Sequence, residues 1–202
     1  MEKFPKISVI LNVNNGGGTL DDCLKLLFLQ DYPTNKIEVV IAEGGCKQNT
    51  LKIIEKYRKA YPKNIKIVKN PKKYKLGRGM GADIASRNAS GEMILLIDTD
   101  NLLIQKKWLK NMTDILLKNK SVNAVQSRLI IPKNSSWIDQ YFGAIGIEDP
   151  FAIPYSLSAQ TIFNPKKFKY DKEQKIYIYE VNKDNFYYFG DNGFLIWKKD
   201  FF

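Results

Sequence analysis

Short apolar runs alternate with longer amphipathic stretches along the chain up to about residue 131. The apolar runs are rich in β-branched residues and have the length of strands, and they cover residues 6–13, 36–43, 64–70, 92–98 and 121–131. Between them apolar residues recur at helical spacing, which predicts helices within residues 20–28, 49–61, 77–91 and 105–119. This alternation is typical of βαβ units, so the sequence predicts an α/β fold with a mostly parallel central sheet flanked by helices.

Unusual polar residues follow three of the predicted strands. These loops are Asn12–Gly18, Glu43–Gln48 and Asp98–Asp100, after the first, second and fourth strands. Because parallel strands end at one edge of their sheet, and ligands of such sheets bind beyond the carboxyl ends, we expect the three loops to meet. The sequence therefore predicts a binding site there.

The fourth strand runs directly into Asp98-Thr99-Asp100, in the stretch "EMILLIDTDN". Two carboxylates one residue apart at a strand end can share a divalent cation, and hard oxygen ligands suit Mg²⁺ or Mn²⁺. The alternative is a polar strand end that caps the following helix.

The composition excludes several kinds of catalytic and metal site and predicts a positively charged surface. The 202 residues include no histidine, which excludes Ser-His-Asp and Cys-His nucleophiles and His-ligated zinc. The net charge is +11, and residues 63–78 contain seven basic residues and no acid, which predicts a surface that faces phosphates or an anionic membrane. A solvated strand and loop explains the same run equally well. The two cysteines show no metal spacing, and with no signal peptide or long apolar run we expect a cytoplasmic protein, at the cytoplasmic membrane face if it binds lipid.

Three stretches, "ISVILNVNNGGGTLDDCLKLLFLQDYP", "IEVVIAEGGCKQNT" and "GEMILLIDTDN", resemble the opening of a family 2 glycosyltransferase with the GT-A fold. The resemblance covers roughly residues 6–130. It departs from the family pattern at Asn12, where proline is usual, and at Gly44 and Cys46, which replace an acid and a serine. It implies one GT-A domain over residues 1–202, with a nucleotide-sugar-binding half at 1–101 and an acceptor-side half at 102–202 that continues past Phe202 if the chain is truncated.

The resemblance also implies roles for individual residues. Asp100 would be the direct metal ligand, and Asp98 would contact the ribose, or the metal through water. Arg78, in the glycine-rich "GRGMGAD", would lie near the donor diphosphate and Asp83 near the donor sugar, although these glycines would serve a plain turn as well. The donor-binding residues implied in this way are Asn12, Val13, Asn14, Glu43, Gly45, Arg78, Asp83, Asp98 and Thr99.

A late acidic residue is the candidate general base. Asp191 lies in "YFGDNGFLIWKK", which resembles the late Gly-acid segment that carries the base in related transferases. Asp-Asn-Gly also favours a plain turn. Glu148 and Asp149 are the alternatives, and a base beyond Phe202 is a further one.

These features together predict an inverting glycosyltransferase that uses a nucleotide-sugar, UDP-linked, with Mn²⁺ or Mg²⁺, and a sugar, lipid-linked or protein acceptor. One alternative is a nucleotidyltransferase that makes a nucleotide-sugar, but its first loop normally carries a basic residue and "NVNNGGG" has none. The other is a non-enzymatic binder of nucleic acid or an anionic surface. Nucleic acid would leave the acidic strand ends unexplained, so we expect no nucleic-acid partner. Peripheral membrane association would involve residues 63–78 and the aromatic segment 137–155.

Overall fold

The computed structural model describes residues 4–15, 18–70, 78–127, 131, 133–145, 169–173, 176–178, 180–181 and 193–202. The chain divides into two compact units. One comprises Met1–Val125 together with Asn192–Phe202, and the other comprises Gln126–Asp191. The division into two halves at residue 101 stays a prediction.

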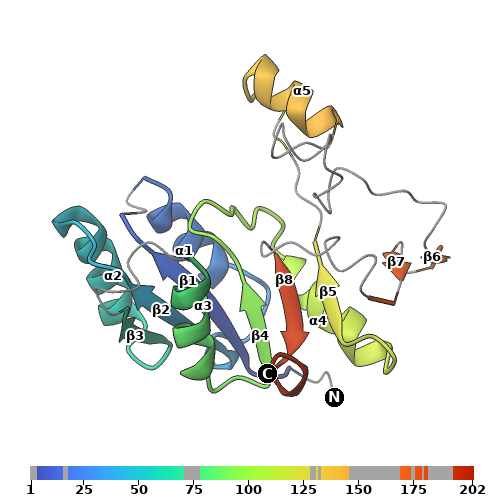
Figure 1. The fold of residues 1–202 in the computed structure, drawn as a ribbon, viewed down its shortest axis with the longest axis horizontal. Coiled ribbons are helices and arrows are strands. Elements are labelled where there is room, and N and C mark those ends of the chain that lie inside the picture. Colours follow the sequence, from blue (N-terminus) through green and yellow to red (C-terminus); the bar gives the residue numbers. More distant parts are fainter. Residues whose placement is uncertain are drawn as a thin grey trace. The chain divides into compact units, whose positions relative to one another are not determined.

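The main sheet has six strands in the order β3-β2-β1-β4-β8-β5 (Figure 1). Their bounds are Ile7–Val13 (β1), Ile37–Glu43 (β2), Ile65–Lys69 (β3), Met93–Leu96 (β4), Ala124–Gln126 (β5) and Phe194–Trp197 (β8). The first four pair in parallel, as the sequence predicts. Strand β8 is antiparallel to β4, so an apolar run from the end of the chain inserts between β4 and β5.

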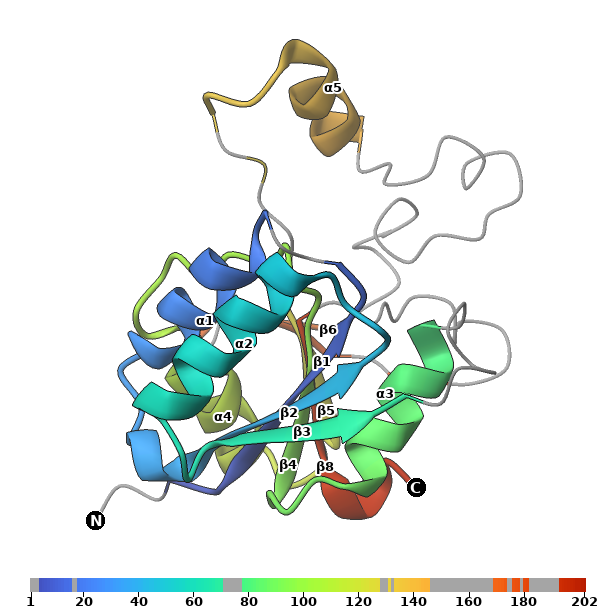
Figure 2. The same ribbon diagram turned by 90° about the vertical axis from the view of Figure 1, so that its left-hand side faces the viewer.

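Helices cover both faces of this sheet (Figure 2). On one face lie α1 (Leu20–Phe28), α2 (Gln48–Ala60) and α4 (Trp108–Lys118), and on the other lies α3 (Arg78–Arg87). The buried residues form two clusters, one on each face, that contain alternate residues of β1 and β2. Burial on both faces explains why these strands are nearly continuous apolar runs in the sequence. The short helices η1 (Thr34–Lys36) and η5 (Lys198–Asp200) complete the unit.

The amino edge of the sheet is closed by a buried polar network around Glu38. Ser8 donates to one carboxylate oxygen of Glu38, and the Ser90 amide donates to the same oxygen at 2.8 Å. The Ser90 hydroxyl donates to the other oxygen at 2.7 Å, and the Gly91 amide donates to Ser8 Oγ at 2.8 Å. A Cβ on Gly91 would meet the Ser8 amide nitrogen at 2.6 Å, so only glycine fits there. The network joins β1, β2 and the turn before β4.

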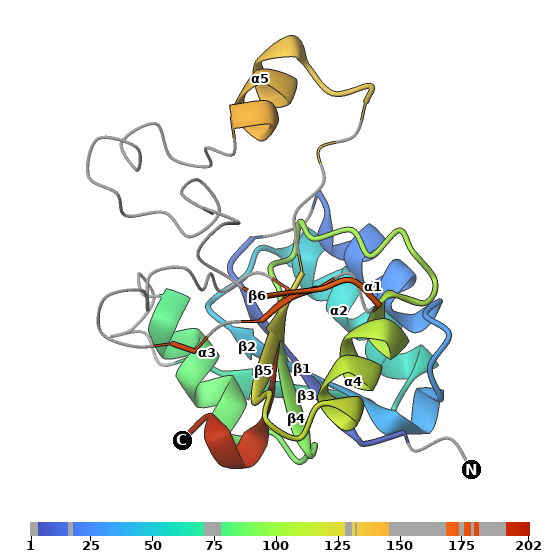
Figure 3. The same cartoon turned by 90° about the vertical axis from the view of Figure 1, so that its right-hand side faces the viewer.

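The C-terminal segment of the first unit packs against the end of α3 (Figure 3). Lys198 Nζ donates to the Ala89 carbonyl at 2.6 Å, and Lys66 Nζ donates to the Asn88 carbonyl at 2.8 Å. Both cations therefore lie at the negative end of the α3 dipole, where they are stabilising.

The second unit contains α5 (Trp137–Ile145) and a two-stranded antiparallel sheet of β6 (Lys169–Asp171) and β7 (Ile176–Ile178). Ser136 caps α5, because its hydroxyl accepts the Asp139 amide at 3.1 Å. In the part of the chain that the structure describes, no helix combines the length and the apolar character needed to cross a membrane.

Candidate active site

The loops after β1, β2 and β4 lie at one edge of the sheet because β1 pairs with both of the other strands. Val13, the last residue of β1, lies opposite Glu43, the last residue of β2. On the other side Ile10 of β1 lies opposite Leu96 of β4, so Asp98 follows at nearly the same level as Val13. The predicted meeting of these three strand ends is therefore what the structure shows.

The loop after β2 folds around the side chain of Glu43. Glu43 Oε1 accepts the amides of Gly45, at 2.6 Å, and of Cys46. Gly45 has a φ of 91°, a left-handed conformation that favours glycine. Burial opposes ionisation of Glu43, but the amides of Cys46 and Gly45 outweigh it and lower the pKa of the carboxyl group. Glu43 is thus a carboxylate that shapes its own loop.

The loops after β1 and β2 are hydrogen-bonded to each other. The Lys47 amide at the start of α2 donates to Asn15 Oδ1 at 2.6 Å, and the Gly44 amide donates to the Val13 carbonyl at 3.1 Å. Asn14 lies in the same loop and is exposed. The described parts of the two loops therefore lie side by side at the carboxyl edge, and we call them the wall.

Helix α3 reaches this edge through Gly81, which lies against the side chain of Asn12. A Cβ on Gly81 would overlap the Asn12 amide group. Arg78 is the first residue of α3; its side chain lies outside what the structure describes. Asp83, one turn into α3, pairs with Arg87, because both its oxygens lie 3.0 Å from Arg87 Nε. A contact between Asp83 and a donor sugar stays a prediction, and it would compete with this pair.

Asp98, Thr99 and Asp100 form a compact turn after β4. The Asp98 amide donates to Asn101 Oδ1 at 2.9 Å, and the Asn101 amide donates to the Asp98 carbonyl at 3.1 Å. Asp100 is exposed, whereas Asp98 and Thr99 are half-buried.

Cys23 of α1 lies directly behind this turn. Its Sγ is 3.7 Å from the Asp98 carbonyl oxygen. Burial, together with the negative charges of Asp100 and Asp98, raises the pKa of the Cys23 thiol to about 12. Cys23 is therefore a neutral thiol behind the acidic turn at physiological pH.

Gln30 is a positioning residue that the sequence interpretation missed. It is buried, its Nε2 donates to the Leu103 carbonyl at 2.9 Å, and its Oε1 accepts the Leu109 amide at 3.0 Å. The next residue adds a bond from the Asp31 amide to the Lys106 carbonyl at 2.7 Å. These bonds fix the segment that follows the acidic turn. The available signal was a glutamine between an apolar helix face and "DYP".

The structure brings eight predicted residues to the carboxyl edge: Asn12, Val13, Asn14, Glu43, Gly45, Asp98, Thr99 and Asp100. The three candidates for the base, Asp191, Glu148 and Asp149, lie outside the described residues. Their roles stay predictions.

The glycosyl transferase family 2 model matches residues 8–188. The chain belongs to this family. This agrees with the resemblance seen in the three sequence stretches, and it covers nearly the whole chain.

Individual family members show the same relationship. The poly(ribitol-phosphate) β-N-acetylglucosaminyltransferase TarS of Staphylococcus aureus is 34% identical over 127 residues, which are 58% of this chain and 22% of TarS. The poly(ribitol-phosphate) β-glucosyltransferase of Bacillus spizizenii is 28% identical over 126 residues, 58% of this chain and 20% of that protein. The chain thus spans about a fifth of the length of these curated relatives.

Solved structures of family 2 enzymes confirm the predicted GT-A-like fold. Residues 1–349 of S. aureus TarS with UDP-GlcNAc give a TM-score of 0.54 at 26% identity, over 65% of this chain and 36% of that one. The mannosyltransferase PcManGT of Pyrobaculum calidifontis gives 0.57 at 24% identity, over 62% of this chain and 36% of that one. The latter shows the fold alone.

The acidic turn of this family 2 chain suits a divalent cation of the Mg²⁺ type. Asp98 and Asp100 offer hard carboxylate oxygens on a turn that Asn101 closes, and Gln30 fixes the segment that follows this turn. Within the described ranges no group of three or more His, Cys, Asp or Glu side chains could hold a metal. Mg²⁺ usually binds through one or two carboxylates, substrate phosphates and water, so two carboxylates fit such a site.

Proposed function

We propose that this chain is the catalytic region of an inverting glycosyltransferase that moves a sugar from a UDP-linked donor to an acceptor hydroxyl and depends on Mn²⁺ or Mg²⁺. One observation carries the proposal. The carboxylates of Asp98 and Asp100 follow β4 at the edge where β1 and β2 also end and their loops begin. Membership of family 2 supports the same reaction class.

The donor site would be the wall formed by the loops after β1 and β2. TarS, whose structures contain UDP and UDP-GlcNAc, is similar over this part of the chain, and this favours a uridine nucleotide. The rigid bonds of Glu43 to its own loop, and of Lys47 to Asn15, would keep the wall in place before a nucleotide binds. Such pre-organisation reduces the entropy lost on binding.

The metal would be bound by Asp100, with Asp98 in direct contact or through water. When bound, such a cation neutralises charge on a departing diphosphate. The chain's own contribution is positional, since Asn101 closes the acidic turn and Gln30 fixes the segment after it. Arg78 at the start of α3 would add a positive charge near the diphosphate.

The acceptor half needs one general base. A carboxylate would take the proton of the acceptor hydroxyl while that oxygen attacks the anomeric carbon from the face opposite the diphosphate. We assign this role to Asp191, with Glu148 and Asp149 as alternatives. The two relatives named above act on poly(ribitol-phosphate), so a polyol hydroxyl joins sugar, lipid-linked and protein hydroxyls as a candidate acceptor.

The proposal is tested by following UDP release from UDP-sugars in Mn²⁺, alongside binding to a random oligonucleotide. A glycosyltransferase hydrolyses or transfers from at least one UDP-sugar and shows no preference for nucleic acid. A nucleotidyltransferase would instead form pyrophosphate from a sugar phosphate and a nucleoside triphosphate. Oligonucleotide binding without turnover of any donor would overturn the proposal.

A further inference from the structure

A dense group of basic residues lies on two neighbouring elements of the first unit. Residues 47–70, which comprise α2, β3 and the turn between them, contain eight basic residues and a single acid, Glu55. All eight basic side chains are exposed. Figure 2 shows α2 and β3 side by side on the face toward the viewer, and β3 is the edge strand of the main sheet. We call this face of the first unit the α2–β3 surface.

The bonds within this surface leave much of its charge available. Glu55 pairs with Arg58 at 2.7 Å, and Asp21 of α1 pairs with Lys56 at 2.7 Å. Lys66 donates to the carbonyl at the end of α3. Further basic side chains, those of Lys52, Lys63 and Lys69, extend the same surface. A concentration of like charge such as this raises the local potential and attracts an anionic partner.

The excess of lysine over arginine on this surface indicates what kind of anionic partner it binds. Seven of the eight basic residues are lysines. Arginine is the usual choice for bidentate recognition of a defined phosphate, whereas lysine acts as a mobile point charge. The depression on α2 has a volume of about 420 Å³, and four of its six lining side chains are charged. It is lined by α2 alone and is open to solvent, unlike the concave, enclosed cleft typical of a small-molecule site.

Two apolar side chains lie among these lysines. Leu51 of α2 is 43% exposed and Ile67 of β3 is 40% exposed. Lysines around a few exposed aliphatic side chains are the combination that binds lipid headgroups, because the charges meet anionic lipids and the apolar groups meet the acyl boundary. We propose that the α2–β3 surface attaches this protein peripherally to an anionic membrane. This assignment rests on charge and fold and is independent of the proposed reaction.

The proposed membrane-binding surface differs from the one that the sequence predicted. The sequence combined residues 63–78 with the aromatic segment 137–155. In the structure α2 adds four cations, Lys52, Lys56, Arg58 and Lys59, and its only acid is Glu55, while Asp21 of α1 pairs with Lys56. Helix α5 belongs to the other compact unit. The binding surface is therefore one helix and one edge strand of the first unit.

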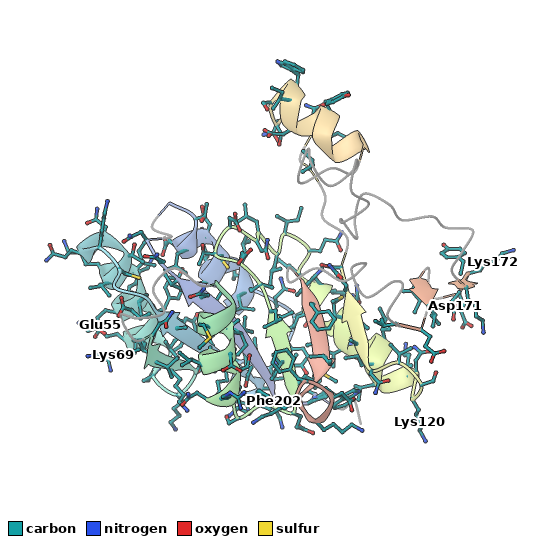
Figure 4. All side chains as sticks on the ribbon, viewed as in Figure 1. Glu55, Lys69, Lys120, Asp171, Lys172 and Phe202 are labelled. Atoms are coloured by element: carbon teal, nitrogen blue, oxygen red, sulfur yellow. The ribbon has the colours of Figure 1, made fainter. Side chains whose placement is uncertain are left out.

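The test is co-sedimentation of the 202-residue chain with vesicles of phosphatidylcholine alone or mixed with phosphatidylglycerol. The test variant replaces Lys52, Lys59 and Lys63 by glutamine. The matched control replaces Lys106, Lys118 and Lys120, which are exposed around α4 and change the net charge equally. Figure 4 labels Lys69 and Lys120 at opposite sides of the first unit. Thermal unfolding of both variants checks that each remains folded.

The proposal predicts binding to mixed vesicles only, and binding that weakens steeply as salt is raised. Each lysine near such a surface contributes about a fivefold change in partition, so the test variant should bind on the order of 100-fold more weakly at low salt. The control should bind nearly as well as the parent. Equal losses in both variants, no sedimentation of the parent, or binding only to a soluble polyanion such as heparin would each overturn the proposal.

Discussion

The two edges of the main sheet use carboxylates in opposite ways. At the amino edge both oxygens of Glu38 accept hydrogen bonds from Ser8 and Ser90, which come from other segments of the chain. At the carboxyl edge Glu43 accepts bonds from its own loop, and the Asp98–Asp100 turn is closed by the neighbouring Asn101. A carboxylate that joins distant segments stabilises the fold, whereas local loops can place carboxylates for a ligand. We therefore expect changes at the amino edge to alter stability and changes at the carboxyl edge to alter binding.

The largest expected effect concerns the candidate general base. Replacing Asp191 by asparagine should reduce transfer by about 10²–10⁴-fold, the usual cost of losing a general base. Donor affinity should stay nearly unchanged, because the proposed donor site is at the carboxyl edge. Steady-state transfer rates and UDP titrations measure the two quantities separately. If Asp191→Asn transfers normally and Glu148→Gln or Asp149→Asn does not, the base is assigned to the wrong residue.

Alanine substitutions of Gly91 and Gly81 compare how much space the two edges leave for a Cβ atom. A Cβ on Gly91 would meet the Ser8 amide nitrogen and the Lys6 carbonyl oxygen, which are backbone atoms, so Gly91→Ala should destabilise the fold by about 3 kcal/mol. The three atoms nearest to a Cβ on Gly81 all belong to the Asn12 side chain. Gly81→Ala should therefore cost less, and adding Asn12→Ala should restore most of the loss.

Urea unfolding of the single and double variants measures this comparison. Gly79→Ala is the matched control within α3, because a Cβ there would meet nothing within 4 Å. It should be neutral or slightly stabilising, since alanine favours helix. If the double variant Gly81→Ala with Asn12→Ala loses as much unfolding free energy as Gly81→Ala alone, the contact between Gly81 and Asn12 is wrongly described.

Breaking the Glu38 network at the amino edge should reduce the free energy of unfolding by less than Gly91→Ala does. Glu38→Gln removes the charge and one acceptor, so the free energy of unfolding should fall by about 2 kcal/mol. Donor affinity per folded molecule should not change, because Glu38 lies at the other edge. Chemical unfolding and UDP titration of the same preparation check both statements. Glu55→Gln, at an exposed position of α2, should leave stability almost unchanged.

The same network predicts a pH dependence. Burial opposes ionisation of Glu38, but the bonds from Ser8 and Ser90 and the charge of Lys6 outweigh it and lower the pKa of the carboxyl group below its ordinary value of 4.5. Its contribution is therefore complete above the unfolded-state pKa and is lost as pH falls through the folded-state pKa. The stability difference between the parent and Glu38→Gln should shrink as pH falls below about 4.5. A difference that stays constant down to acid pH would contradict this account of Glu38.

The sequence predicted the features that depend on local periodicity. The parallel strands, the helices between them and the meeting of Asn12, Glu43 and Asp98 all follow from apolar spacing and from the geometry of parallel sheets. The fifth predicted strand, at 121–131, is described as three residues, Ala124–Gln126.

Other features depend on pairing between distant segments and had no local signal. The insertion of β8 beside β4 joins residues about a hundred positions apart. Glu38 looks like an outward-facing strand residue until the register with Ser8 is known. The same holds for Gln30, whose partners Leu103 and Leu109 lie far along the chain. Long-range register, rather than residue type, determined what the sequence did not show.

The most direct test of the central claim is the affinity for UDP, measured by calorimetry in Mn²⁺ and in EDTA. The account predicts that the parent binds at least about tenfold more tightly with Mn²⁺, and that Asp100→Asn loses this difference while its unfolding midpoint is unchanged. Asp114→Asn, which removes a surface carboxylate of α4, serves as the matched control and should behave like the parent. Equal affinity of the parent in Mn²⁺ and in EDTA, or a full metal effect in Asp100→Asn, would contradict a metal site at the end of β4.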